Sequence, residues 1–127
     1  MKANSDRMNK KILIVDDDPR NIFALKLTLK ARGFDIETAL SAQEAIDKLE
    51  NDNIGLVLMD MMMPDIDGYQ AIGMIRKIDK LDHIPIIAVT AQAMEEDHQK
   101  CIDAGAADYI KKPIDVDQLL NVIEKVS

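Results

Sequence analysis

The segment IGLVLMD, residues 54–60, decides the fold because an uncharged apolar run ends there in a single carboxylate, Asp60. A continuous apolar run of this length is typical of a strand that is buried on both faces of a parallel sheet. A second run, KILIV at residues 11–15, ends in the same way at Asp16 and Asp17. Open α/β sheets place their ligand sites at the carboxyl ends of strands. If these two strands are neighbours, their carboxylates meet at one edge of the sheet.

A cluster of three carboxylates at one sheet edge indicates a metal site. Like charges at short range repel each other, and a hard divalent cation bound through oxygen relieves that repulsion. Mg²⁺ usually keeps several water molecules and takes only one or two carboxylates from a protein. We therefore expect Asp16, Asp17 and Asp60 to form a partly open site for Mg²⁺, or for Mn²⁺ in its place.

Two hydrophobic periods alternate along the chain, which predicts five pairs of a strand and a helix. We expect strands at residues 11–15, 34–39, 54–59, 84–89 and 107–110, and helices at residues 19–31, 41–50, 67–80, 94–104 and 115–126. Asp18 can cap the first helix, and the stretch SAQE at residues 41–44 matches a capping box that opens the second. Gly33 and Gly105 suit helix ends. Right-handed crossovers between parallel strands then give a doubly wound α/β sandwich of three layers.

The composition argues against several classes of partner. The chain has 127 residues, the size of one domain, and its net charge is −7. Nucleic acids need a basic face and, when single-stranded, aromatic platforms, but aromatic residues make up only 3% of this chain. No apolar run reaches the roughly 20 residues of a membrane span. The single cysteine, Cys101, fits a reducing cytoplasm. We expect a cytoplasmic domain at residues 11–127, after a disordered lead at residues 1–10, that binds neither nucleic acid nor membrane.

Other groups that carry chemistry follow the remaining strands. Thr90 and Ala91 come after the fourth strand, and Lys112 comes after the fifth. Together with the carboxylates, these residues provide a hydroxyl and an ammonium at the same sheet edge. A metal-assisted phosphoryl acceptor needs this set, since one carboxylate attacks phosphorus while the cationic and hydroxyl groups bind the equatorial oxygens.

Four motifs at the strand ends resemble those of response-regulator receiver domains. They are IVDDDP at residues 14–19, LMDMMMPDIDG at 58–68, AVTA at 88–91 and DYIKKP at 108–113. Each motif is weak alone, but in this order and position the set is specific. The resemblance runs from about Lys11 to the last helix. It implies the flavodoxin-like strand order 2-1-3-4-5, as in the chemotaxis regulators.

The resemblance implies that Asp60 accepts a phosphoryl group from the phosphohistidine of a histidine kinase. Asp17, Asp60 and the backbone carbonyl of Met62 would bind Mg²⁺, and Asp16 would act near the metal, often through water. Such a domain catalyses its own phosphorylation and dephosphorylation but is no enzyme for a separate substrate. Two positions would tune the lifetime of the phosphorylated state, because Met62 and Gln92 flank the path of the attacking water in the family's geometry.

The remaining implied roles concern the switch that follows phosphorylation. Lys112 would pair with the phosphoryl oxygens, and Thr90 and the Ala91 amide would move to bind them. Tyr109 would change rotamer with the state of Thr90. The resemblance also implies a cis peptide bond between Lys112 and Pro113.

Several residues have a purely structural interpretation. Asp18 is expected to be a helix cap, and Cys101 to be plain core packing. His83 and His98 lack the spacing of metal ligands, so both are expected at the surface. Gly73 lies inside a predicted helix, where it should cost about 1 kcal/mol relative to alanine.

Three other interpretations compete with the receiver. A Mg²⁺-dependent phosphohydrolase with an aspartyl nucleophile usually needs a second aspartate two residues later, where this chain has Met62. Turnover of a phosphomonoester would favour it. A flavodoxin-like cofactor binder would want a Ser-, Thr- and Gly-rich loop after the first strand, where this chain has three aspartates; a coloured protein would favour it. A degenerate receiver would have lost groups such as Thr90 and Lys112, which are present.

The partners follow from the same resemblance. The expected phosphoryl donor is a histidine kinase or a histidine phosphotransfer protein. The chain would be either a stand-alone receiver or a domain cut from a larger protein such as a hybrid kinase. Its output surface would be the fourth helix, fifth strand and fifth helix, including Tyr109, where an effector or a second copy would bind.

Overall fold

The apolar side chains of the central strands point alternately to two faces of one sheet. Along β1 (Lys11–Val15), Leu13 packs in one apolar cluster, whereas Ile14 packs in another. The side chains of β3 (Ile54–Asp60) divide between the same two clusters. Both faces must therefore be covered, as is usual for parallel strands.

The structure is a computed structural model and describes residues 11–63, 66–91 and 95–126. The other strands are β2 (Ile36–Ala39), β4 (Ile86–Thr90) and β5 (Asp108–Lys111), and the helices are α2 (Pro19–Ala31), α3 (Ala42–Asn51), α4 (Gly68–Arg76), α5 (Glu95–Ala104), α6 (Val116–Val126) and the short 3₁₀ helix η1 (Asp79–Leu81). The expected disordered lead at residues 1–10 and the predicted start of a helix at Met94 lie outside the described residues.

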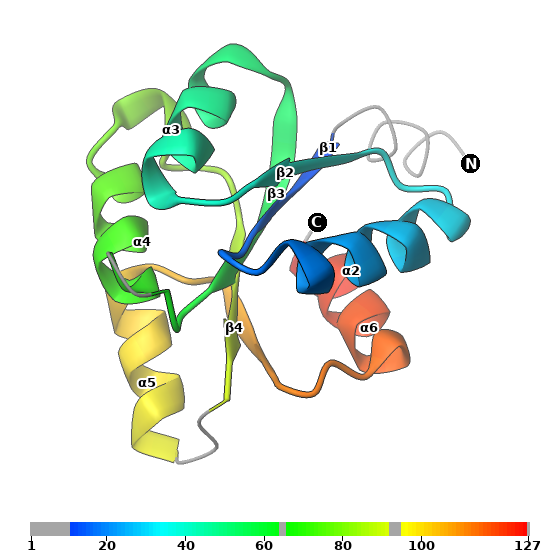
Figure 1. The fold of residues 1–127 in the computed structure, drawn as a ribbon. Coiled ribbons are helices and arrows are strands. Elements are labelled where there is room, and N and C mark those ends of the chain that lie inside the picture. The colour runs from blue at the N-terminus through cyan, green and yellow to red at the C-terminus, as the bar shows by residue number, and fades with distance from the viewer. Residues whose placement is uncertain (1–10, 64–65, 92–94, 127) are drawn as a thin grey trace.

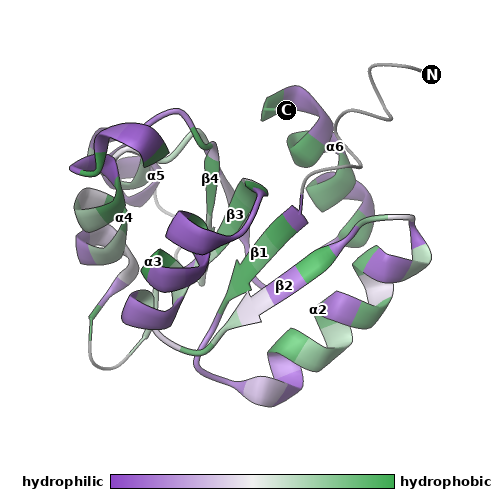
Figure 2. Ribbon diagram, turned by 90° about the horizontal axis from the view of Figure 1, so that it is seen from above, coloured by the Kyte–Doolittle hydropathy of each residue, from purple (hydrophilic) through white to green (hydrophobic). Residues whose placement is uncertain are grey.

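The five strands form one parallel sheet in the order β2-β1-β3-β4-β5. Helices α3, α4 and α5 cover one face of the sheet, and α2 and α6 cover the other (Figure 1). Seen from above, the central strands β1 and β3 are hydrophobic along most of their length (Figure 2). The predicted doubly wound α/β sandwich and its strand order are confirmed.

The predicted helix over residues 67–80 is too long. Helix α4 ends at Arg76, and the chain then forms η1 before it enters β4. The guanidinium of Arg76 donates hydrogen bonds to the carbonyl oxygens of Asp82 at 2.9 Å and Ile84 at 2.8 Å. These bonds turn the following segment back towards the end of α4, so the helix cannot continue. The predicted strand start at Ile84 was also wrong, since β4 begins two residues later.

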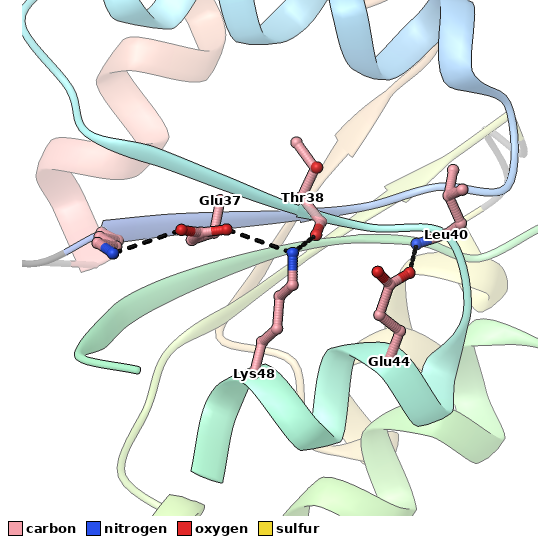
Figure 3. A network of polar contacts seen from close by, with 6 residues as sticks. Glu37, Thr38, Leu40, Glu44 and Lys48 are labelled. Atoms are coloured by element: carbon pink, nitrogen blue, oxygen red, sulfur yellow. Dashed lines mark hydrogen bonds and ion pairs between the residues drawn. The ribbon is translucent and has the colours of Figure 1, made fainter. Parts of the chain in front are cut away.

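The edge strand β2 is shorter than predicted, because its ladder begins at Ile36 and not at Phe34. Its outer side is protected by Lys48 of α3, whose Nζ donates hydrogen bonds to the carbonyl oxygen of Thr38 and to the Glu37 carboxylate (Figure 3). The carbonyl of Ala39 accepts from the amide of Asp16, just after β1, which places the preceding carbonyl, that of Thr38, on the open side of the sheet. Lys48 thus satisfies an acceptor that the sheet leaves unpaired.

The predicted capping box at the start of α3 is confirmed. The Ser41 hydroxyl accepts from the Glu44 amide at 3.1 Å, and the Glu44 carboxylate accepts from the Leu40 amide at 2.7 Å (Figure 3). Gly33 follows the C-terminal end of α2, and Gly105 follows that of α5. Their φ values of 92° and 119° favour glycine. These local signals fix where the chain reverses between the layers.

Candidate functional site

Three aspartates meet at the carboxyl ends of β1 and β3. The register pairs Val15 with Met59, so the residues that follow, Asp16 and Asp60, are neighbours across the two strands. Asp16 is 8% exposed and Asp60 is 4% exposed, whereas Asp17 is open to solvent. Carboxylate oxygens of the three residues lie within 4.8 Å of one another. The predicted convergence of the three acids is therefore present.

The Asp16 carboxylate is held by the start of α2. Its Oδ1 accepts a hydrogen bond of 2.9 Å from the Asp18 amide, and its Oδ2 accepts a longer one of 3.4 Å from the Asn21 side chain. Burial raises the pKa of Asp16, the Asp18 amide lowers it, and the charge of Asp60 raises it again. The net direction is upward, because burial, the largest cause, and the neighbouring charge of Asp60 together outweigh the hydrogen bond from the Asp18 amide.

The Asp60 carboxylate is bound from two sides. Its Oδ1 accepts a hydrogen bond from the Met62 amide at 3.0 Å and forms an ion pair with Lys112 Nζ at 3.2 Å. Lys112 directly follows β5, and its backbone amide donates to the Thr90 carbonyl at 2.8 Å. The Lys112–Pro113 peptide bond is cis, as the resemblance implies. Two segments distant in the sequence, residues 60–62 and Lys112, therefore meet at one carboxylate.

The segment after Asp60 is packed closely against the start of α4. A Cβ atom added at Gly68 would lie 2.6 Å from Met61 Cα and 3.0 Å from the Asp60 carbonyl oxygen. The Gly68 amide donates to the Met61 carbonyl at 3.4 Å, and the Met61 amide donates to the Val89 carbonyl at 3.0 Å. Glycine at this position lets α4 approach, which positions the residues that follow the carboxylate.

Some of the other predicted site residues lie at the same sheet edge, and others do not. Thr90 is buried at the end of β4, and Ala91 follows it at the surface of the same sheet edge. Gln92 lies outside the described residues. Tyr109 lies in β5, one residue before the buried Ile110, and it contacts His98 of α5 instead of the acidic cluster.

The expectation that His98 is a surface residue was wrong. Its ring is half-buried and stacks on Tyr109, and its buried Nε2 atom has no hydrogen-bond partner among the residues that the structure describes. Sequence reasoning also missed Asn21, which reaches Asp16 from the first turn of α2. The only sign of this role in the sequence was that Asn21 comes shortly after the helix cap Asp18. The Asp18 side chain accepts a hydrogen bond from the Arg20 amide, as expected of a cap.

A cavity of about 320 Å³ extends from the acidic cluster between α2 and the start of α6. Asp16, Asp60 and Lys112 line one part of it, and its other walls are mainly apolar, with Leu58 and Ile114 among them. No pattern in the sequence indicates this cavity. It leaves one side of the carboxylates accessible to small molecules.

The donor set fits a hard divalent cation. The three acids offer carboxylate oxygens, the ligand type that Mg²⁺ and Mn²⁺ prefer over softer atoms. Because Asp17 is exposed, water can complete the coordination sphere.

Among the described residues, no helix is both long and apolar enough to cross a membrane.

Comparisons of this chain with known proteins all indicate one family. The sequence profile described as "response regulator receiver domain" matches residues 12–124. An uncharacterised 14.6 kDa protein of Leptolyngbya boryana is 38% identical over 90% of this chain and 87% of its own length. Hybrid signal transduction histidine kinase L of Dictyostelium discoideum is 37% identical over 91% of this chain, which spans 7% of that kinase.

Solved structures show the same architecture. The chemotaxis protein CheY4 of Vibrio cholerae superposes with a TM-score of 0.87 at 26% identity, over 93% of this chain and 98% of that one. A receiver domain protein from Methanospirillum hungatei is 35% identical and gives a TM-score of 0.80, over 92% and 93% of the two chains. Both likenesses extend over more than nine-tenths of this chain.

Proposed function

Because the chain belongs to the response regulator receiver domain family of two-component signal transduction, we propose that Asp60 accepts a phosphoryl group from the phosphohistidine of a histidine kinase. The observation that carries this proposal is the Asp60 carboxylate at the centre of the site, bonded through Oδ1 to Lys112 and the Met62 amide. The attacking atom is then Oδ2. As its bond to phosphorus forms, the phosphorus–nitrogen bond of the donor breaks, and the imidazole leaves and takes up a proton.

A divalent cation, Mg²⁺ or Mn²⁺, belongs to this proposal. Asp17, Asp60 and the Met62 carbonyl would hold it, and Asp16 would contact it through water. When bound, the cation neutralises charge on the carboxylates and on the phosphoryl oxygens. Until then Lys112 supplies the positive charge next to Asp60.

Phosphorylation changes the partners of Lys112. The phosphoryl group adds about two negative charges and several acceptor oxygens to Asp60. Lys112 binds one of these oxygens, and the Thr90 hydroxyl and the Ala91 amide bind others. Tyr109 then changes rotamer and alters the surface formed by α5, β5 and α6, where an effector or a second copy binds.

The proposed setting is the cytoplasm, with a histidine kinase or a histidine phosphotransfer protein as donor. The protein does not turn over a separate substrate, but it catalyses the gain and loss of its own phosphoryl group. Met62 and Gln92 set the rate of loss, because these two positions flank the path of the attacking water in the family's geometry. A Met62→Asn variant should therefore change the dephosphorylation rate more than the free energy of unfolding. An unchanged decay rate in a labelled-phosphate assay would remove this role.

The test of phosphoacceptance is the intact mass after incubation with acetyl phosphate and Mg²⁺. The wild type should gain the mass of one phosphoryl group, and Asp60→Asn should gain none. Lys111→Met, at the exposed neighbour of Lys112, is a matched control and should be phosphorylated like the wild type, whereas Lys112→Met should be impaired. Absence of an adduct on the wild type would refute the proposal. Turnover of a phosphomonoester would favour a phosphohydrolase instead.

A further inference from the structure

Met62 differs from the methionines around it in exposure. Its side chain is 55% exposed, whereas Met59, Met61 and Met63 are all buried. Among the described residues, the other exposed methionine is Met74 on α4, at 37%. The chain's single cysteine, Cys101, is fully buried. Within the part of the chain that the structure describes, Met62 is therefore the most accessible sulfur for an oxidant in solution.

The position of Met62 is fixed relative to Asp60. Its backbone amide donates to Asp60 Oδ1 at 3.0 Å. The buried side chains of Met61 and Met63 hold the segment on both sides of it, and Met61 is packed under Gly68. The exposed thioether is thus attached to a backbone position that directly contacts the carboxylate of the site.

We propose that Met62 is an oxidation site through which hydroperoxides shorten the lifetime of the phosphorylated protein; this inference rests on the proposed phosphorylation of Asp60. The sulfur attacks the outer oxygen of the peroxide, so a sulfur–oxygen bond forms and the oxygen–oxygen bond breaks. Sulfur loses two electrons, and the peroxide is reduced to water or, from an organic hydroperoxide, to an alcohol. The product is methionine sulfoxide.

The oxidation changes the chemistry available beside Asp60. A thioether is only a weak hydrogen-bond acceptor, so it cannot orient a water molecule well. A sulfoxide is polar and carries an oxygen that accepts hydrogen bonds from water. Held next to the phosphorylated carboxylate, this oxygen orients water for attack on phosphorus, and the phosphoryl group is lost faster. The same reaction at Met74 adds its oxygen on α4, outside the segment that contacts Asp60.

The experiment combines peptide mass mapping with a decay measurement. The full chain is treated with a low dose of hydrogen peroxide, and sulfoxide is located by mass spectrometry of its peptides. Treated and untreated samples are then phosphorylated with acetyl phosphate and Mg²⁺, desalted, and followed by intact mass. Among the methionines that the structure describes, sulfoxide should appear first at Met62. The lifetime should fall by about three- to tenfold, a small part of the effect of a fully positioned proton acceptor.

Three variants separate Met62 from other oxidation events, each compared with itself before and after peroxide. Met62→Leu should lose the peroxide response, and Met74→Leu should keep it. Met62→Gln, which carries a side-chain carbonyl in place of the sulfoxide, should have the shorter lifetime without peroxide. Methionine sulfoxide reductase should restore the original lifetime of the treated wild type.

Two results would overturn the inference. One is oxidation of Met74 ahead of Met62, which would show that Met62 is not the accessible sulfur. The other is an unchanged lifetime at full Met62 oxidation, or an equal response in Met62→Leu. Absence of any adduct on untreated protein would instead contradict the proposed function, and with it the effect on lifetime, while the peptide map would still decide whether Met62 is the preferred oxidation site.

Discussion

The imidazole ring of His98 lies flat against the phenol ring of Tyr109, with ring centroids 3.8 Å apart and 20° between their planes. This contact joins α5 to β5 at the residue that we propose as the switch. Any rotation of Tyr109 must break the stack, so the contact favours the orientation seen here. Within residues 11–63, 66–91 and 95–126, the buried Nε2 atom of His98 has no hydrogen-bond partner, and this lowers the benefit of the contact.

Substitutions of His98 should separate these two effects. His98→Ala removes the stack and should lower the free energy of unfolding by about 1 kcal/mol. His98→Phe keeps an aromatic ring and removes the buried polar atom, so it should raise the free energy of unfolding by about 1 kcal/mol. Urea denaturation measures both. Equal destabilisation by the two variants would show that the stack contributes nothing to stability.

Asp16→Asn should stabilise the metal-free protein at neutral pH. Burial and the charge of Asp60 raise the pKa of Asp16, so folding favours its protonated form. That contribution is complete below the ordinary pKa of an aspartate and is lost as the pH rises through the raised pKa. At neutral pH the wild type therefore contains an unfavourable charge, and Asp16→Asn should raise the free energy of unfolding by about 1 kcal/mol.

The pH and metal dependence provide the controls for this substitution. The advantage of Asp16→Asn should shrink as the pH falls to the ordinary aspartate pKa, because the wild type is then protonated as well. Added Mg²⁺ should stabilise the wild type more than the variant, since binding to the folded state raises its stability. Thermal unfolding in EDTA and in Mg²⁺ measures both trends. A variant less stable than the wild type in EDTA at neutral pH would contradict the expectation.

The sequence was sufficient where a local pattern determines the structure. The apolar runs before Asp16 and Asp60 predicted both strand ends. A residue that follows a buried parallel strand must lie at the carboxyl edge of the sheet, so its position follows from the strand. The capping residues Asp18 and Ser41 predicted the starts of two helices for a similar reason, since each bonds within its own first turn. The convergence of the acids follows once the strands are neighbours.

The sequence was insufficient where distant groups determine the structure. Helix α4 ends at Arg76 because its guanidinium bonds carbonyls six and eight residues later and the Gly105 carbonyl across the fold. His98 was assigned to the surface because nothing in its neighbourhood shows that α5 packs its ring on Tyr109. The cavity beside Asp60 likewise depends on how α2 and α6 diverge over the sheet.

Two glycines of α4 should respond to alanine in opposite directions. A Cβ atom at Gly68 would lie 2.6 Å from Met61 Cα, so Gly68→Ala should lower the free energy of unfolding by about 1–3 kcal/mol. A Cβ atom at Gly73 would meet nothing within 4 Å, so Gly73→Ala should raise it by about 0.5–1 kcal/mol. Denaturant midpoints give both values.

The glycine pair also tests how the site is positioned. Gly68→Ala must displace the segment after Asp60, so it should slow phosphorylation by acetyl phosphate, whereas Gly73→Ala should leave the rate unchanged. Normal phosphorylation of a destabilised Gly68→Ala would show that the close approach of α4 does not position the carboxylate. Destabilisation by Gly73→Ala would contradict the open space at that position.

The Glu37–Lys48 contact at the edge strand should make stability depend on pH. Burial alone would raise the pKa of Glu37, but hydrogen bonds from Lys48 and Lys11 hold it below the ordinary value. The resulting stabilisation is present above the ordinary pKa of a glutamate and is lost as the pH falls through the lowered pKa. Lys48→Met should therefore lower the free energy of unfolding by about 1 kcal/mol at neutral pH and by less in acid. Part of this cost comes from the Thr38 carbonyl, which loses its hydrogen-bond donor.

Lys80→Met is the control, because it breaks a more exposed 3.9 Å ion pair with Glu50. It should change the free energy of unfolding by less than about 0.5 kcal/mol. Urea titrations at several pH values compare the two variants, and a cost for Lys48→Met that does not diminish in acid would assign its effect to the Thr38 carbonyl alone.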